Sequence, residues 1–251
     1  MEERDKYARR VFETALYFRE MHEENQGGDT RAIRLLNPFN TRSVALRKFV
    51  LDELYKGQRL TLTEATVKLA SWGGSAGRPA LAEIESKLLA LASEHEREFR
   101  KVASRDELIE RAFLRLSRYI RRIRTEGASG HTRVFEFFIP GDFVPTGLGN
   151  KGPGHREHVV PCKFLLEASL DRFDKGASDE EVAHFIRRFL VIIEIQVDER
   201  DVLDRSRRQG GLGLKETMPE GWCFDKGCLF DRLHVAGIEF RPPTGISPCT
   251  H

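Results

Sequence analysis

One stretch decides the fold expected for the second half of the chain, namely Gly154-His155-Arg156-Glu157-His158-Val159-Val160-Pro161. The final proline disfavours the helical conformation at the valine before it, and two β-branched valines suit the end of a strand. The stretch follows a glycine-rich loop at residues 141–154, and loops of this kind often carry functional groups. We therefore predict that Glu157 and His158 lie next to each other on short extended backbone.

The segments around this stretch predict a mixture of helices and short strands. Residues 133–140 are rich in β-forming residues and predict a strand, and the apolar run 189–195 predicts a buried strand. Ser178 and Glu181 have the spacing of a helix capping box. Helices are expected at 162–173, 178–188 and 197–205.

The first half of the chain predicts helices throughout. Apolar residues recur at helical spacing over 4–24, 43–55, 61–71 and 80–124. The last of these is expected to be interrupted near Ser104, and Thr61 or Thr63 can cap the third with Glu64. Because glycine and proline become frequent at residue 127, we expect an α+β protein with a helical region over 1–126 and an α+β region over 127–251.

Composition narrows the protein class. The 251 residues are 40% hydrophobic and 32% charged, which is ordinary for a globular protein. The apolar stretches are shorter than the roughly 20 residues that span a bilayer, and the first residues do not resemble a secretory signal. Four cysteines do not make a disulfide framework. A cytoplasmic protein with reduced thiols, and no membrane partner, is expected.

The residues at 157 and 158 have the chemistry of phosphodiester hydrolysis. A histidine can take a proton from water near neutral pH, and a carboxylate beside it can hold a hard divalent cation. The stretch from Glu157 to Pro161 resembles the opening of an HNH (ββα-metal) endonuclease motif. In that family an acidic residue precedes the general-base histidine, and a proline follows three positions after it.

The resemblance implies an HNH-like ββα core over about residues 130–205 and metal-dependent cleavage of DNA. It makes His158 the general base and places the metal, Mg²⁺ or Mn²⁺, on Glu157 and Asp198, with Glu199 and Asp201 as alternatives to Asp198. The residues expected to contact the substrate are His155, Arg156 and Lys215.

The alternative is a non-catalytic module on a degenerate HNH-like fold that binds nucleic acid or protein. The asparagine of the family falls near Phe189 in this chain, and phenylalanine cannot orient a catalytic histidine. Acidic residues such as Asp198 also favour the first turn of a helix on electrostatic grounds alone.

One helical face over residues 105–125 is basic, and it carries Arg111, Arg115, Arg118 and Arg122. Such a stripe can follow a DNA backbone. The alternative is a solvated face whose arginines pair with nearby glutamates. The helical region is also where self-association into a homo-oligomer is expected.

Cysteines near the C-terminus suggest a second metal site. Cys223 and Cys228 are separated by four residues, and His234 and Cys162 are further ligand candidates for Zn²⁺. Buried free thiols are the alternative interpretation.

Overall fold

The computed structural model describes residues 3–24, 30–37, 43–50, 54, 60–72, 81–95, 103–127 and 130–247. The chain divides into two compact units, Met1–Arg111 and Ala112–His251. The boundary between the two units lies inside a helix. The sequence analysis places the boundary between the helical and the α+β region at residue 127, just beyond the end of that helix. The α+β class with a helical N-terminal region is confirmed.

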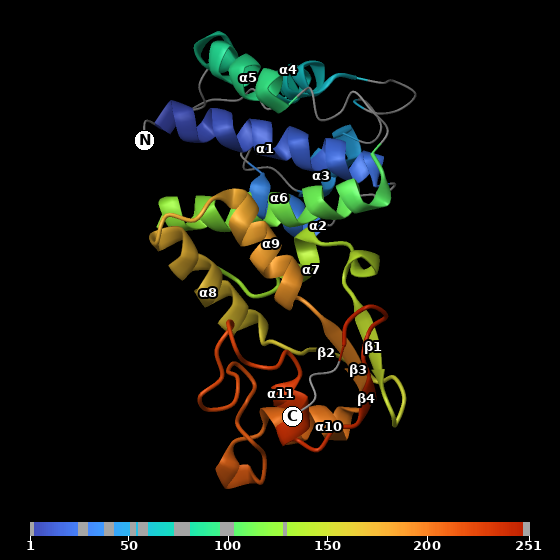
Figure 1. Cartoon of the computed structure of the whole chain (residues 1–251). Coiled ribbons are helices and arrows are strands. Elements are labelled where there is room, and N and C mark those ends of the chain that lie inside the picture. Colours follow the sequence, from blue (N-terminus) through green and yellow to red (C-terminus); the bar gives the residue numbers. More distant parts are fainter. Residues whose placement is uncertain are drawn as a thin grey trace. The chain divides into compact units, whose positions relative to one another are not determined.

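The first unit is built from helices (Figure 1): α1 (Glu3–Glu23), α2 (Thr30–Leu36), α3 (Ser43–Phe49), α4 (Leu62–Trp72) and α5 (Leu81–His95). Helix α1 packs against α4 and α5. The capping prediction at α4 is confirmed, because the Glu64 amide donates to Oγ1 of Thr61 over 3.1 Å and the Thr61 amide donates to the Glu64 carboxylate over 2.8 Å. Helix α2 was not predicted.

Helix α6 (Arg105–Thr125) begins where the sequence predicts an interruption. The amide of Ser104 donates to the Glu107 carboxylate over 2.6 Å, and the Glu107 amide donates to the Ser104 hydroxyl over 3.3 Å. This reciprocal capping satisfies backbone donors that a new helix leaves exposed. The prediction of a break near Ser104 is confirmed.

The second unit contains the remaining helices and a small sheet. The helices are α7 (Val134–Phe138), α8 (Cys162–Asp174), α9 (Asp179–Phe189), α10 (Val197–Asp204) and α11 (Asp231–Val235), with 3-10 turns η3 (Gly141–Phe143) and η4 (Arg207–Gln209). The strands are β1 (Thr146–Gly149), β2 (His155–His158), β3 (Ile192–Ile195) and β4 (Phe240–Arg241). The predicted helices α8, α9 and α10 and the predicted strand β3 are confirmed.

The strand predicted at 133–140 is wrong, because Val134–Phe138 forms helix α7. Its β-forming side chains are used for packing: Val134, Phe135, Phe137 and Phe138 are all buried. Tertiary burial therefore overrides the local β preference. Strand β1 was missed because two of its four residues are glycines, which are depleted in strands.

The four strands form one mixed sheet in the order β2-β3-β1-β4. Strands β1 and β3 are parallel, while β2–β3 and β1–β4 are antiparallel. Helices α8 and α9 lie side by side and occupy the connection between β2 and β3 (Figure 1). Helix α10 follows β3 directly, so the order along this part of the chain is β2-α8-α9-β3-α10.

Alternation along β2 separates its polar side chains onto two faces of the sheet. Glu157 lies opposite Ile193, and its neighbour His158 lies opposite Ile192. Because successive side chains of a strand point to opposite faces, His155 and Glu157 share one face and Arg156 and His158 share the other.

Among the helices of the described residues, none combines the length and the hydropathy needed to span a bilayer.

Candidate functional site

A cavity of about 300 Å³ opens on the face of the sheet that carries His158. Its polar lining comes from Glu136 of α7 and from Arg156 and His158 of β2. The rest of the lining is apolar or glycine: Phe135, Ile139, Gly141, Val144, Leu190 and Ile192. A small apolar chamber with a carboxylate, a guanidinium and an imidazole has the general form of a ligand site.

His158 is uncharged at neutral pH in this setting. Burial, together with the nearby Arg156 and Arg232 cations, lowers its pKa from 6.5 to about 4. A buried imidazole next to cations resists protonation because the charged form loses hydration and is repelled. The free base is the form that can accept a proton or coordinate a cation.

Arg156 borders the cavity, next to a glycine. A Cβ atom on Gly141 would lie 3.2 Å from Nη1 of Arg156, so glycine at this position gives the guanidinium room against the backbone. A guanidinium presents a planar set of donors that matches phosphate oxygens. Arg156 can therefore bind an anionic group at this cavity, which also carries the Glu136 carboxylate.

Glu157 lies on the opposite face of the sheet and is held by protein groups. Its Oε1 is 2.5 Å from Nη1 of Arg232, and its Oε2 is 3.2 Å from Nε2 of His155. The Glu157 side chain is buried, and Arg232 is almost fully buried, with 1% of its surface exposed. The Glu157 charge is thus matched inside the fold, and the strand geometry separates it from His158.

Arg232 of α11, like Glu136 of α7, is a residue at this site that sequence reasoning missed. Its Nε donates to the carbonyl of Leu214 over 2.8 Å, and its Nη1 also donates to the carbonyl of His158 over 3.1 Å. Its Nη2 is 3.5 Å from the Asp204 carboxylate. One buried guanidinium therefore ties β2 to the end of α10 and to the segment after η4.

Asp198 and Glu199 lie at the start of α10 and interact with Lys151. The Lys151 ammonium is 3.6 Å from Asp198 and 3.4 Å from Glu199. Glu199 also accepts a hydrogen bond of 2.9 Å from the Gln196 amide, as a helix cap does. The side chain of Asp198 is 74% exposed. The structure therefore brings these two carboxylates together with a lysine, and not into a ligand group with Glu157 or His158.

The basic face of α6 is only partly open to solvent. Arg115 and Arg122 are buried; Arg115 donates to the carbonyl of Phe138 over 2.7 Å, and Arg122 lies over the Tyr119 ring at 5.1 Å. Arg111 and Arg118 are half-buried. In this fold Arg115 and Arg122 make packing contacts, which leaves Arg111 and Arg118 as the members of the stripe nearer to solvent.

The exposed arginines of the same helix pair with carboxylates of the second unit. Arg121 bonds to Asp179 over 2.7 Å, and Arg124 makes two bonds to Asp174, of 2.8 and 2.7 Å. These pairs involve aspartates of other segments, not the nearby glutamates of the alternative interpretation. Lys215, expected to contact substrate, is exposed beside Glu216.

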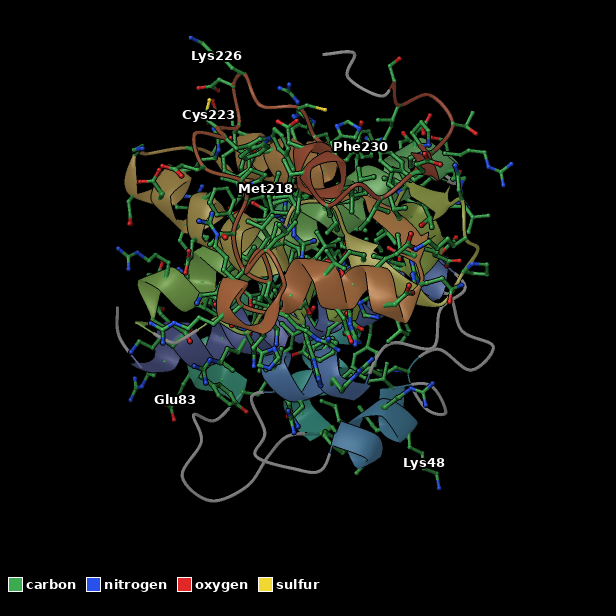
Figure 2. All side chains as sticks on the ribbon, turned by 90° about the horizontal axis from the view of Figure 1, so that it is seen from below. Lys48, Glu83, Met218, Cys223, Lys226 and Phe230 are labelled. Atoms are coloured by element: carbon green, nitrogen blue, oxygen red, sulfur yellow. The ribbon has the colours of Figure 1, made fainter. Side chains whose placement is uncertain are left out.

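A possible metal site of different composition lies at α11. Ligand atoms of Cys228, Asp231 and His234 all lie within 4.8 Å of one another, so this group could hold a metal ion. Among the described residues, this is the group of three His, Cys, Asp or Glu side chains whose ligand atoms lie close enough together to share an ion. The predicted partner Cys223 is exposed, lies at an outer edge in Figure 2, and is not in the group. Cys162 is not in it either.

One of the described cysteines departs from the reduced state expected for the chain. Cys228 takes part in a disulfide, whereas Cys162 and Cys223 are free. Burial raises the pKa of the Cys162 thiol, and the carboxylates of Glu136 and Glu157 raise it further. Cys162 is therefore a protonated, unreactive thiol at neutral pH.

Comparison with known proteins adds no relative. No protein-family model matches the sequence, and no curated protein and no solved structure has significant similarity to the chain.

Proposed function

We propose that this protein hydrolyses phosphodiester bonds in nucleic acid, with DNA as the expected substrate and His158 as the general base. The observation that carries the proposal is the cavity in which a neutral His158 lies beside Arg156. The resemblance of Glu157–Pro161 to the HNH motif supports the same reaction class.

Each polar group of the cavity has a role in this proposal. Arg156 binds a non-bridging phosphate oxygen and orients the substrate. His158 takes a proton from the attacking water; its imidazole is uncharged at neutral pH, and its lowered pKa makes it a weaker base than an ordinary histidine. Arg156 is exposed at the mouth of the cavity, where a phosphate group can reach it.

The divalent ion of this reaction fits Glu136 better than the carboxylates expected from the motif. Glu157 is paired with Arg232, and Asp198 and Glu199 are paired with Lys151. Mg²⁺ in phosphate-processing sites is commonly held by one or two carboxylates together with substrate phosphates, and Glu136 offers a carboxylate at the cavity. When bound there, Mg²⁺ or Mn²⁺ would neutralise charge that develops on the leaving oxygen.

The test is cleavage of supercoiled plasmid by the full chain with Mg²⁺ or Mn²⁺. Single variants remove each group: His158→Ala, Arg156→Ala and Glu136→Gln. We expect His158→Ala to lower the cleavage rate at least about 100-fold, the usual contribution of a general base. The matched control is His131→Ala, because His131 is an exposed histidine outside the cavity.

The outcomes separate the assignments. Cleavage that persists unchanged in His158→Ala would rule out His158 as the base. Cleavage lost equally in His131→Ala would point to a general loss of folding, which circular dichroism of both variants checks. A normal rate in Glu136→Gln across a metal titration would remove Glu136 as the ion ligand.

A non-catalytic nucleic-acid-binding module is the second candidate, and two observations favour it. The acidic residue of the HNH-like motif is held by Arg232 and His155. Phe189, at the position of the family's asparagine, is buried against the rings of Phe185 and Phe224. Salt-sensitive DNA binding without cleavage by either metal would support this candidate over the enzyme.

A further inference from the structure

The group formed by Cys228, Asp231 and His234 has the composition of a zinc site. The three residues follow each other at intervals of three, across the start of α11. Zinc binds sulfur, nitrogen and oxygen ligands at about 2.0–2.3 Å, so ligand atoms already within 4.8 Å of one another need small side-chain rotations to share one ion. Magnesium and calcium prefer ligand sets made of oxygen alone.

The backbone around Cys228 is fixed in a way that suits a metal-bound thiolate. The amide of Phe230 donates to Sγ of Cys228 over 3.4 Å, and hydrogen bonds to a charged form favour that form. The Cys228 amide donates to the Asp231 carboxylate over 3.1 Å, and the Trp222 indole donates to the Cys228 carbonyl over 2.7 Å. Two of the three ligands are therefore positioned relative to each other without an ion.

The third ligand is also oriented. The His234 ring stacks on Phe240 of β4, with ring centroids 5.6 Å apart. This contact restricts rotation of the imidazole, so less conformational freedom is lost when a metal binds. Three protein ligands leave a fourth tetrahedral position for water.

The same sulfur, however, takes part in a disulfide in this structure. A disulfide sulfur is not a thiolate, and the thiolate is the form that binds zinc. We propose that Cys228, Asp231 and His234 form a zinc site that becomes available only when the disulfide of Cys228 is reduced. Zinc binding and the disulfide are then mutually exclusive states of one segment.

The change from the disulfide to the zinc-bound state requires a reductant, and a dithiol can act as one. The dithiol gives two electrons and two protons to the disulfide of Cys228 and becomes a disulfide itself. The Cys228 thiol then loses its proton as zinc binds, so uptake of the ion releases a proton.

Zinc at this site affects the element that holds Glu157. Arg232 lies between Asp231 and His234 in α11 and reaches β2 from there. An ion bound to residues on both sides of Arg232 stabilises this short helix in the reduced protein.

The test uses Co²⁺ and Zn²⁺ with the full chain, in oxidised form and after reduction by a phosphine. Co²⁺ bound to a thiolate has a sulfur-to-metal charge-transfer band in the near ultraviolet, so it reports directly on Cys228. We expect this band only in the reduced protein, with one ion bound per chain. Zn²⁺ should displace Co²⁺ and abolish the band.

Variants assign the ligands. Cys228→Ser should remove the band, and Asp231→Asn and His234→Gln should each weaken Zn²⁺ binding at least about tenfold. The matched controls are Cys223→Ser, Asp225→Asn and His184→Gln, which alter the same residue types outside the group and should bind like the wild type.

A further variant keeps the test valid if reduction itself perturbs folding. Replacing Cys162, Cys223 and Cys249 by serine leaves Cys228 as the one cysteine of the chain, so it cannot form an internal disulfide. This variant should bind Co²⁺ with the thiolate band without reductant. Equal Zn²⁺ affinity in oxidised and reduced wild type, or a band that survives Cys228→Ser, would overturn the proposal.

Discussion

Arg232 and Glu157 form a buried ion pair between residues that are 75 positions apart in the sequence, with 2.5 Å between Nη1 and Oε1. The pair joins α11 to the central part of β2. Arg232 also donates to the carbonyl of His158, so a distant C-terminal residue contacts the backbone of the strand that lines the cavity.

Replacing Arg232 with methionine should destabilise the second unit strongly. The change leaves the buried Glu157 carboxylate without its main partner, which typically costs about 3–5 kcal/mol of unfolding free energy. Urea denaturation followed by circular dichroism measures the loss. The control is Arg205→Met, which breaks a surface pair with Asp201 and should cost less than about 1 kcal/mol. Equal losses in both variants would contradict a special role for the buried pair.

His158 should make stability depend on pH between 6.5 and about 4. Its folded-state pKa of about 4 is below the ordinary value of 6.5, so the unfolded state binds more protons across this range. Stability is unaffected by this group above pH 6.5 and is lost as the pH falls toward 4, on the order of 3 kcal/mol in all.

The measurement is the unfolding free energy of wild type and His158→Gln over this pH range. The difference between the two proteins should change across it, because glutamine does not titrate. His184→Gln changes an exposed histidine and should leave the wild-type pH dependence in place. A constant difference between wild type and His158→Gln would show that the imidazole is not shifted.

Gly147→Ala should destabilise the sheet. A Cβ at this position would lie 2.4 Å from the carbonyl oxygen of Arg241 and 2.6 Å from Cδ1 of Ile193. Because one of these neighbours is backbone, the strands must separate, at a cost of about 1–3 kcal/mol. Gly141→Ala is the matched control: its Cβ meets only the flexible end of Arg156, so thermal stability should stay near the wild-type value. A neutral Gly147→Ala would contradict the close approach of β1 and β4.

Gln196→Ala should loosen the turn before β2 without unfolding the unit. The Gln196 side-chain amide donates to the carbonyls of Lys151, Gly152 and Pro153, at 3.3, 3.3 and 2.9 Å. Without these bonds, hydrogen exchange in residues 150–155 should become several-fold faster, while α9 should be unchanged. Gln209→Ala, in the separate turn η4, is the control. Faster exchange throughout the unit would instead indicate global destabilisation.

Local signals explain which parts of the fold were predictable. The helix starts at Thr61 and Ser178 were found because each cap is a hydroxyl residue with a glutamate three residues later, and both ends of that interaction lie within one turn. Helix α7 was predicted as a strand because its phenylalanines favour strands locally, and only the tertiary fold shows that they pack as a helix.

The site was predictable in composition but less so in arrangement. Sequence reasoning placed His158 and Arg156 in one functional region, and both line the cavity. The separation of Glu157 from His158 follows from the two-residue period of a strand, a signal present in the sequence. The pairing of Glu157 with Arg232 had no such signal, because the two residues meet only through the packing of α11.

The pairing of β2 with β3 also has a consequence for how the chain reaches its native state. The two strands are neighbours in the sheet although α8 and α9 intervene, so their hydrogen bonds require closure of a long loop. The two helices contact each other locally and can form beforehand, which shortens the distance that the strands must close. We therefore expect the α8–α9 hairpin to assemble early and the strand with His158 to be among the last elements to become ordered.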